Sequence, residues 1–318
     1  MPLPNDERVV ALANDVLQMF DTIFGLHPGF RAAHAKGQML TGTFTPTPQA
    51  ASLSKAPHFT QSSTPVTVRF SNSTGIPLLP DNVGDANPRG FAVRFNLAEH
   101  VHTDIVSHSI DNFPARNGQE FLELLKALAA SGPDVPSPKP VEKFLGSHPA
   151  TLAFIQAPKP MGRSFATFPF YAVSAFLFTN AAGKAAYGRY RILPEGGPEF
   201  LNEAEAAAIS PSYHFDEIAQ RIKAGPIRFK VIIQLGAEGD QTDDPTVRWP
   251  EDRPLVEVGT IELTELVTDN AQEQQHIIFD PIPRLEGIEP AADPLFELRA
   301  AIYLISGRRR RAAPPTGS

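Results

Sequence analysis

The sequence of 318 residues contains no cysteine. This absence excludes disulfides, thiolate nucleophiles, cysteine-ligated zinc sites and iron–sulfur clusters. Any bound metal must therefore be held by His, Tyr or carboxylate side chains, or within a cofactor.

Features of secretion and membrane insertion are also missing. Residues 1–7 contain neither the basic nor the apolar region of a signal peptide, and no apolar run reaches 18 residues. The 28 Lys and Arg residues are outnumbered by 35 Asp and Glu residues, which gives a net charge of −7. An acidic balance disfavours general nucleic-acid binding, because that binding depends on neutralising phosphates. We therefore expect a cytoplasmic protein with neither a nucleic-acid nor a membrane partner.

The composition is that of a globular protein with an excess of proline. Hydrophobic residues make up 42% and charged residues 20% of the chain, which is enough apolar material for a sizeable core. The 32 prolines are about twice the usual share of roughly 5% and are spread along the whole chain. This spread favours many short elements joined by irregular connections.

Hydrophobic periodicity predicts both helices and strands. Apolar residues at helical spacing predict an amphipathic helix over residues 6–24, capped by Asn5. Alternating or apolar segments predict strands at 66–71, 90–96, 168–178, 185–193, 228–235 and 255–263. Further helices are predicted at 119–129, 141–145, 149–156, 213–224 and 294–306.

No internal repeat and no shift of composition divides the chain. We therefore expect one α+β domain over residues 1–318, built around a closed or nearly closed antiparallel sheet, with its core at about 20–306. The basic run at 308–311 precedes a proline-containing end, so residues 307–318 are expected to form a solvated tail. His100 and His102 lie between two predicted strands, and we interpret this His-x-His pair as part of a solvated loop and not as a metal site.

Several short stretches follow one another in a particular order along the chain. They are RAAHAKG at 31–37, VRFS at 68–71, NPRGFAVRF at 87–95 and LRAAIY at 298–303. Each is weak alone, but together they resemble the haem catalases over about residues 20–306, and the early end of the chain makes it similar to the small catalase-related peroxidases. The resemblance implies a catalase-like closed antiparallel β-barrel core with surrounding helices. It also implies haem b, with its iron, buried between the barrel and a C-terminal proximal helix.

On the distal side of the haem, the resemblance assigns His34 as the catalytic histidine and Ser71 as the hydroxyl that orients it. Splitting a peroxide on ferric haem requires a proton to move from one peroxide oxygen to the other, and a neutral imidazole can accept and return it. Ser71 can fix the ring by bonding its other nitrogen. Phe121 matches the aromatic residue that stacks on the distal haem face, and its alternative is a place in the apolar core.

On the proximal side, the resemblance assigns Tyr303 as the axial ligand of the iron, since phenolate is the ligand expected of a catalase. Arg299 precedes it by four residues, so its guanidinium can favour the phenolate by charge and hydrogen bonding. Among the other tyrosines, three lie in predicted strands and Tyr213 has no Arg four residues ahead of it. Arg31 and Arg69 match the cations that bind the haem propionates, and ordinary salt bridges are their alternative.

The distal side also departs from the family. A gap-free alignment places the family's distal Asn at His108 or Ser109, so the amide is missing. Ala32 stands where full catalases carry a larger residue, and Asn72 and Ser73 replace apolar positions. These differences imply a wider and more polar distal side.

The resemblance and these departures favour a haem-dependent peroxidase that reduces organic hydroperoxides or hydrogen peroxide with a one-electron donor. The alternatives are a catalase that disproportionates hydrogen peroxide, an isomerase of fatty-acid hydroperoxides similar to the catalase-related allene oxide synthases, and a haem storage or sensing protein. His34 argues against storage or sensing, because a carrier needs no positioned acid–base group. We expect a small homo-oligomer.

Overall fold

The computed structural model describes residues 2–315. The strands are β1 Gly37–Pro46, β2 Thr64–Ser71, β3 Gly90–Ala98, β4 Val101–His108, β5 Phe170–Tyr171, β6 Phe176–Thr179, β7 Ala185–Pro194, β8 Ile227–Leu235, β9 Leu255–Leu266 and β10 Ile288–Pro290. The helices are α1 Glu7–Phe24, α2 Ala50–Leu53, α3 Pro57–Thr60, α4 Gly118–Ala129, α5 Pro140–Ser147, α6 Pro149–Gln156, α7 Glu203–Ala208, α8 Tyr213–Ala224, α9 Asn270–His276 and α10 Leu295–Ala312.

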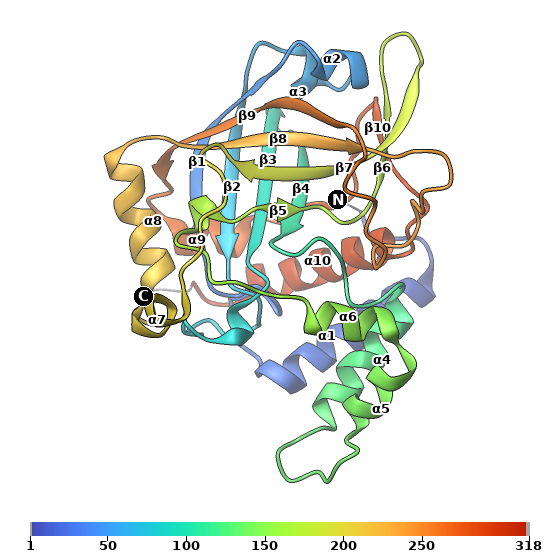
Figure 1. Cartoon of the computed structure of the whole chain (residues 1–318), viewed down its shortest axis with the longest axis vertical. Helices are drawn as coiled ribbons and strands as arrows, with labels where there is room; N and C mark the ends of the chain where they lie inside the picture. Colours follow the sequence, from blue (N-terminus) through green and yellow to red (C-terminus); the bar gives the residue numbers. More distant parts are fainter. Residues whose placement is uncertain (1, 316–318) are drawn as a thin grey trace.

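Eight of the strands close into an antiparallel barrel (Figure 1). They follow the order β7-β5-β4-β3-β2-β1-β9-β8, and β8 pairs with β7 to close the ring. The strand β6 pairs with the first residues of β7, on the same edge as β5, and β10 pairs with β6. The predicted α+β class and closed antiparallel barrel are therefore confirmed.

Phenylalanine side chains fill the interior of the barrel. The ring of Phe91 on β3 lies 5.0 Å from that of Phe170 on β5 and 5.3 Å from those of Phe70 on β2 and Phe229 on β8. Because β8 is not a neighbour of β2 or β3, these contacts cross the inside of the barrel. Successive side chains of a strand point to opposite faces, so Ser71, next to Phe70, points outward.

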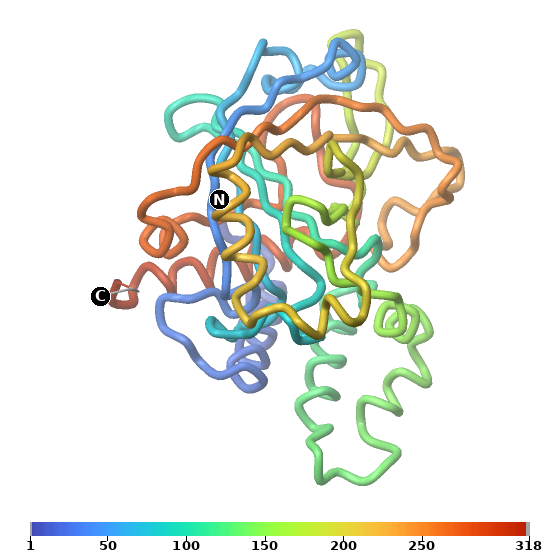
Figure 2. The backbone as a smooth tube through the Cα atoms, turned by 60° about the vertical axis from the view of Figure 1, so that its left-hand side comes forward, coloured from blue at the N-terminus to red at the C-terminus, as the bar shows by residue number. Residues whose placement is uncertain are grey.

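A layer of helices covers this outer face. Helices α1, α4 and α10 pack on one another around a second apolar cluster that contains Leu17, Leu122 and Leu298. Two other side chains of α10, Phe296 and Ala300, join the apolar cluster of the barrel. Helix α10 therefore lies between the barrel and α1, as Figures 1 and 2 show.

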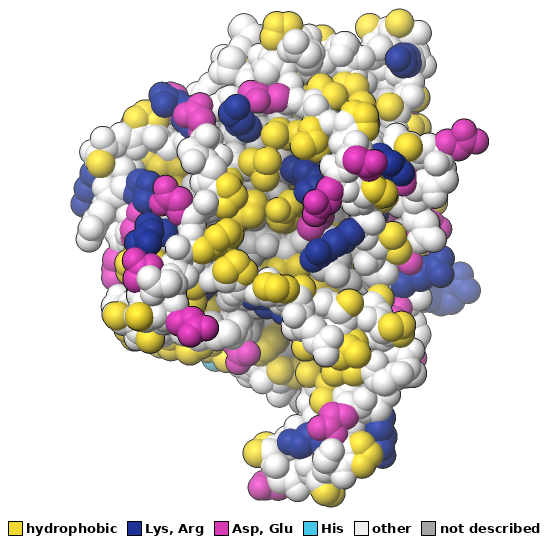
Figure 3. Space-filling model, viewed as in Figure 1, with side chains coloured by type: hydrophobic (Ala, Val, Ile, Leu, Met, Phe, Trp, Pro, Cys, Tyr) yellow, Lys and Arg dark blue, Asp and Glu magenta, His cyan; other side chains and the backbone are white. Residues whose placement is uncertain are grey.

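The outer surface is mixed in character. On the face drawn in Figure 3, acidic and basic side chains are interspersed, and the α4–α5 hairpin projects as a separate lobe. Among the helices within residues 2–315, none has both the length and the apolar character that crossing a membrane requires.

Most of the predicted elements are present, with differences at their ends. Asp6 and not Asn5 caps α1, since its side chain accepts a hydrogen bond from the Arg8 backbone. The predicted strand 168–178 is two short strands, β5 and β6, separated by residues 172–175. The strands β1 and β4 were not predicted, because glycine and polar residues interrupt their apolar patterns.

Two predictions about charged or ionisable segments are wrong. Residues 307–312 are the last turns of α10 and not a tail, and the Arg310 side chain is buried there, whereas Arg308, Arg309 and Arg311 are exposed as predicted. His102 lies in β4, so only His100 belongs to a connection between strands. Residues 316–318 of the predicted tail lie outside the described residues.

Buried imidazoles should make the fold sensitive to acid. Burial lowers the pKa of His58 to about 3 and that of His214 to about 4. The unfolded chain binds these protons near pH 6.5, so the free energy of unfolding falls as the pH drops below 6.5, by about 2 kcal/mol per imidazole at pH 5. Urea unfolding at pH 7 and pH 5 should show this loss. It should be smaller in His58→Phe but unchanged in His100→Asn, whose imidazole is exposed, and an equal loss in all three proteins would contradict the assignment.

Candidate active site

His34 occupies a strained backbone position just before β1. Its φ of +57° lies in the left-handed region, which residues other than glycine rarely adopt. Two hydrogen bonds hold it there, because the His34 N–H donates to the Ser73 carbonyl and the His34 carbonyl accepts from Arg69 Nη2 at 2.7 Å. The imidazole Nδ1 then lies 3.1 Å from Ser71 Oγ on β2. The structure thus brings together the two residues predicted for the distal side.

Gly90 provides the space for this pair. It is the cross-strand partner of Ser71, and a Cβ at position 90 would lie 2.9 Å from His34 Nδ1 and would collide with Ser71 Oγ. Any side chain here would push the imidazole away from the barrel wall. The glycine of the 87–95 stretch is therefore required for the close approach of His34.

The environment keeps His34 neutral. Burial lowers its pKa to about 4, and the nearby positive charge of Arg69 acts in the same direction. At pH 7 the ring therefore carries a single proton, with one nitrogen free to accept another.

His108 continues the same row of side chains. Gly90 pairs with Ser71 on one side and with His108 on the other, so the outward-facing row runs from β2 through β3 to β4. Burial, together with the charges of the neighbouring His34 and Arg299, lowers the pKa of His108 to about 3. The Ser109 hydroxyl instead accepts a hydrogen bond from the Arg89 backbone. Of the two positions aligned with the missing amide, His108 is thus the one beside His34.

Asn72 does not contribute to a more polar distal side. Its amide donates to Asp81 Oδ1 at 2.8 Å and its oxygen accepts from the Arg89 guanidinium, and all three side chains are buried. This network fixes the loop between β2 and β3. The prediction for Asn72 is therefore wrong, because buried polar partners already satisfy its amide.

The proximal candidates lie on one face of α10. Arg299 Nε donates to Tyr303 Oη at 3.3 Å, and Arg299 Nη1 donates to Ser174 Oγ at 3.4 Å. The second contact ties the pair to the segment between β5 and β6. Ser174 could not be selected from the sequence, because this contact spans 125 residues.

A cluster of arginines is the most unusual electrostatic feature of the structure. Arg31 donates to the carbonyls of Gln274 and Ile277 at 3.0 Å each, and Arg69 donates to Gln274 Oε1 at 2.6 Å. Arg310 on α10 donates to the Ile277 carbonyl at 2.8 Å. Within residues 2–315, no carboxylate pairs with any of these three side chains, so the salt-bridge alternative for Arg31 and Arg69 does not apply.

The pKa values show what this arrangement costs. Burial lowers the pKa of Arg69 to about 9, and that of Arg310 to about 10, with the charge of the neighbouring arginine adding to each. Burial and the other two cations also lower the pKa of Arg31 well below its usual range. Arg69 and Arg310 are buried and Arg31 is partly buried. Three packed cations that have no carboxylate partner among the described residues favour an anion at this place. Arg310 was missed in the sequence, although it follows Tyr303 by seven residues and so lies on the same face of α10.

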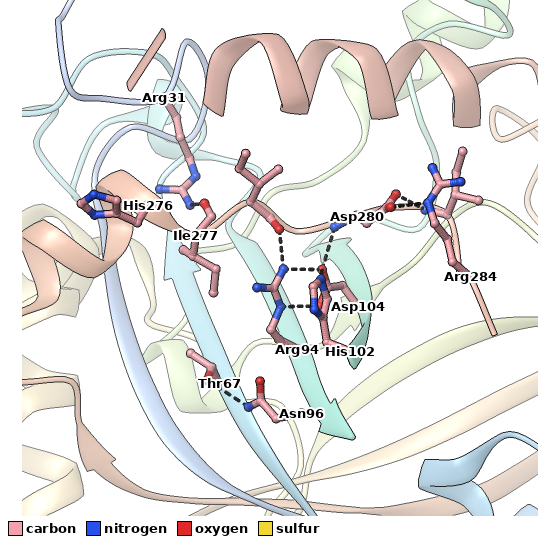
Figure 4. A network of polar contacts seen from close by, with 12 residues as sticks. Arg31, Thr67, Arg94, Asn96, His102, Asp104, His276, Ile277, Asp280 and Arg284 are labelled. Atoms are coloured by element: carbon pink, nitrogen blue, oxygen red, sulfur yellow. Dashed lines mark hydrogen bonds and ion pairs between the residues drawn. The ribbon is translucent and has the colours of Figure 1, made fainter. Parts of the chain in front are cut away.

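The segment after α9 is fixed to the outside of the barrel (Figure 4). Arg94 of β3 forms a two-point ion pair with Asp104 of β4, with distances of 2.8 and 2.9 Å, and also donates to the Ile278 carbonyl. Asp104 accepts from the Asp280 backbone at 2.7 Å. These contacts position the Ile277 carbonyl that two of the arginines bind.

A pocket of about 220 Å³ reaches this arginine cluster. Its lining includes Arg31, Ala32 and Arg310. Solvent or a ligand group can therefore reach the guanidinium groups from this side.

Phe121 lies on α4 and is half-buried in the helical layer. Its ring is 5.3 Å from that of Phe113 and 6.1 Å, edge to face, from that of Phe20. These contacts fit a core residue, and the remaining accessible surface leaves room for a stacked ligand. Its stacking role stays a prediction.

Comparison with known proteins identifies the family. The family model described as Catalase matches residues 28–314. A catalase-related peroxidase of Mycolicibacterium paratuberculosis is 34% identical over 289 residues, covering 90% of this chain and 90% of that protein. A catalase-related peroxidase of Synechococcus elongatus is 31% identical over 304 residues, covering 93% of this chain and 88% of the relative. Catalase-1 of Arabidopsis thaliana is 28% identical over 303 residues, with 88% and 60% covered.

Solved structures agree on the fold. A fungal catalase superposes with a TM-score of 0.78 at 23% identity, covering 93% of this chain and 61% of that chain. Catalase A from Saccharomyces cerevisiae also gives a TM-score of 0.78, at 24% identity, with 98% and 65% covered. The predicted resemblance to the small catalase-related peroxidases is confirmed, and the chain belongs to the catalase family.

Proposed function

We propose that this protein is a haem b peroxidase of the cell interior that reduces organic hydroperoxides and hydrogen peroxide with a one-electron donor. The observation that carries the proposal is the pairing of two chemically different sites around α10. One is the neutral His34 held by Ser71, and the other is the Arg299–Tyr303 pair next to an arginine cluster that has no carboxylate partner within residues 2–315. The relatives named catalase-related peroxidases, which match along about 90% of their length, support the proposed peroxidase function.

The residues present fit haem b. This cofactor has two propionates, and the three clustered arginines provide the positive charge and the donors that two carboxylates need. Tyr303 provides the phenolate oxygen for the iron, and Arg299 stabilises negative charge on that oxygen. When bound, ferric haem supplies the Lewis acid and the electrons that break the peroxide bond.

The protein's part in the reaction is proton movement. His34 Nε2 takes the proton of the hydroperoxide and then returns it to the oxygen that leaves. The hydrogen bond between Nδ1 and Ser71 Oγ keeps the ring in the orientation that this transfer requires. The lowered pKa of His34 keeps Nε2 available as a base at neutral pH.

The same site chemistry leaves catalase activity and fatty-acid hydroperoxide isomerisation as alternatives. His108 in place of an amide and the small Ala32 favour the peroxidase, because they change how a second peroxide is held. The electron donor and a small homo-oligomer remain predictions.

Substrate class separates these functions. The haem-loaded protein should turn over cumene hydroperoxide and a lipid hydroperoxide only when an aromatic donor is present, and faster than free haem does. The donor's oxidation and oxygen release should be followed together. Oxygen release from hydrogen peroxide with a kcat/KM of roughly 10⁷–10⁸ M⁻¹s⁻¹, within about tenfold of the diffusional ceiling, without donor-dependent turnover of cumene hydroperoxide would contradict the peroxidase and favour the catalase. Donor-independent loss of the lipid hydroperoxide would favour the isomerase.

A further inference from the structure

Two imidazoles border the same glycine on the outer wall of the barrel. Gly90 is the cross-strand neighbour of His108, and its missing Cβ makes room for the His34 ring. Directly opposite residues in an antiparallel pair have side chains about 4.5–5.5 Å apart at their Cβ positions. His34 and His108 are therefore neighbours, which agrees with the effect of the His34 charge on the pKa of His108.

The hydrogen bonds of the two rings differ. His108 Nδ1 accepts the Ile110 N–H at 3.4 Å, so the proton of the neutral ring is on Nε2. His34 uses Nδ1 to bond Ser71 Oγ, which leaves its Nε2 free to accept a proton. Within residues 2–315, neither Nε2 atom has a hydrogen-bond partner. The pair thus offers one acceptor on His34 and one donor on His108.

On the basis of the proposed function, we propose that His108 is a substrate-binding residue whose Nε2–H donates to the alkoxy oxygen of an alkyl hydroperoxide. In such a peroxide the terminal oxygen carries the only O–H proton, which His34 accepts. The alkoxy oxygen has no proton of its own and needs a hydrogen-bond donor. One acceptor and one donor satisfy this molecule completely. Hydrogen peroxide has a second O–H, for which His108 offers no acceptor because the Ile110 N–H occupies its Nδ1. The structure therefore favours alkyl hydroperoxides as the substrate class.

Variants of His108 test this inference in the haem-loaded protein. His108→Phe keeps a ring of similar shape but removes the donor, and His108→Asn provides an amide with both a donor and an acceptor. The control is His102→Phe, on the same strand and the same outward face but at its solvent-exposed end. Cyanide binding to the ferric protein, measured by absorption at pH 7, reports the donor without requiring turnover. The second measurement is the ratio of kcat/KM for cumene hydroperoxide to that for hydrogen peroxide.

Cyanide affinity should fall about tenfold in His108→Phe, as expected for one lost hydrogen bond. It should stay within about threefold of wild type in His108→Asn, whose amide N–H replaces the donor, and in the control, which keeps His108 itself. The kcat/KM ratio should fall in His108→Asn, because the amide oxygen of Asn can accept the second O–H of hydrogen peroxide. Unchanged cyanide affinity in His108→Phe, or an unchanged ratio in His108→Asn, would overturn the inference.

Failure of the proposed function would look different. In that case the wild-type protein would show no donor-dependent turnover of either peroxide, whereas the cyanide titration would still report whether His108 donates into the site. Circular dichroism and haem content of each variant identify any that fail to fold, and His108→Asn provides a second substitution of different shape.

Discussion

Tyr303→Phe is expected to lose most of its haem or to show a changed ferric spectrum. The substitution keeps the aromatic ring, which packs in the apolar cluster of α1, α4 and α10, so the fold should remain intact. It removes only the hydroxyl oxygen that accepts from Arg299 Nε. Without this oxygen the iron loses its predicted axial ligand, and Arg299 loses the acceptor it faces.

The measurement is the haem content and absorption spectrum of the purified variant, with circular dichroism as a check on folding. Tyr187→Phe is the matched control, because Tyr187 lies on the exposed part of β7 and contacts none of the candidate site residues in the described part of the structure. The control should bind haem like wild type. An unchanged Soret band and unchanged charge-transfer bands in Tyr303→Phe would remove Tyr303 as the ligand.

The sequence predicts the fold where local patterns are long. The amphipathic pattern of α1 extends over more than two helical turns, and the alternation of β2, β3 and β8 extends over at least six residues in each strand. The type of each of these elements is therefore clear from the sequence. The strands β1 and β4 are different. Glycines interrupt β1, and polar residues such as Asp104 serve partners on other segments, so tertiary contacts decide their conformation.

The same distinction applies to the candidate site. His34, Ser71, Arg299 and Tyr303 belong to short motifs, and each pair forms the contact that its motif implies. Choosing between His108 and Ser109 instead required the register of β3 with β4. The third arginine of the cluster, Arg310, could not be distinguished from its exposed neighbours without the position of the segment after α9.

Asn72 illustrates why a substitution in sequence does not by itself reveal its effect. If the Asn72 amide faced a substrate channel, it would make the distal side of the haem site more polar. In this structure Asp81 and Arg89 bind that amide in a buried network, so its polarity serves the β2–β3 loop. The direction of a side chain, which a single sequence does not contain, decides between these roles.

His34→Gly is expected to keep haem but to react with peroxide about 10²–10⁴-fold more slowly, which corresponds to about 3–5 kcal/mol of barrier. Two variants are compared, His34→Gly and His34→Ala. Glycine is included because the backbone at position 34 is left-handed, and only glycine adopts this conformation without strain. Both variants remove the base next to Ser71 and leave Arg299, Tyr303 and the arginine cluster unchanged. The rate is measured by stopped-flow absorption after mixing ferric protein with cumene hydroperoxide.

The pH dependence supplies an independent control. The wild-type base must be neutral to accept a proton, and burial lowers the pKa of His34 to about 4. The wild-type rate should therefore stay level from pH 7 to about 5 and fall as the pH drops through about 4, whereas the variants should lack this fall. Added imidazole should restore part of the rate in His34→Gly, whose cavity can admit it. A haem-loaded variant that reacts within a few fold of wild type at pH 7 would exclude His34 as the proton carrier, because the proton would then be transferred without it.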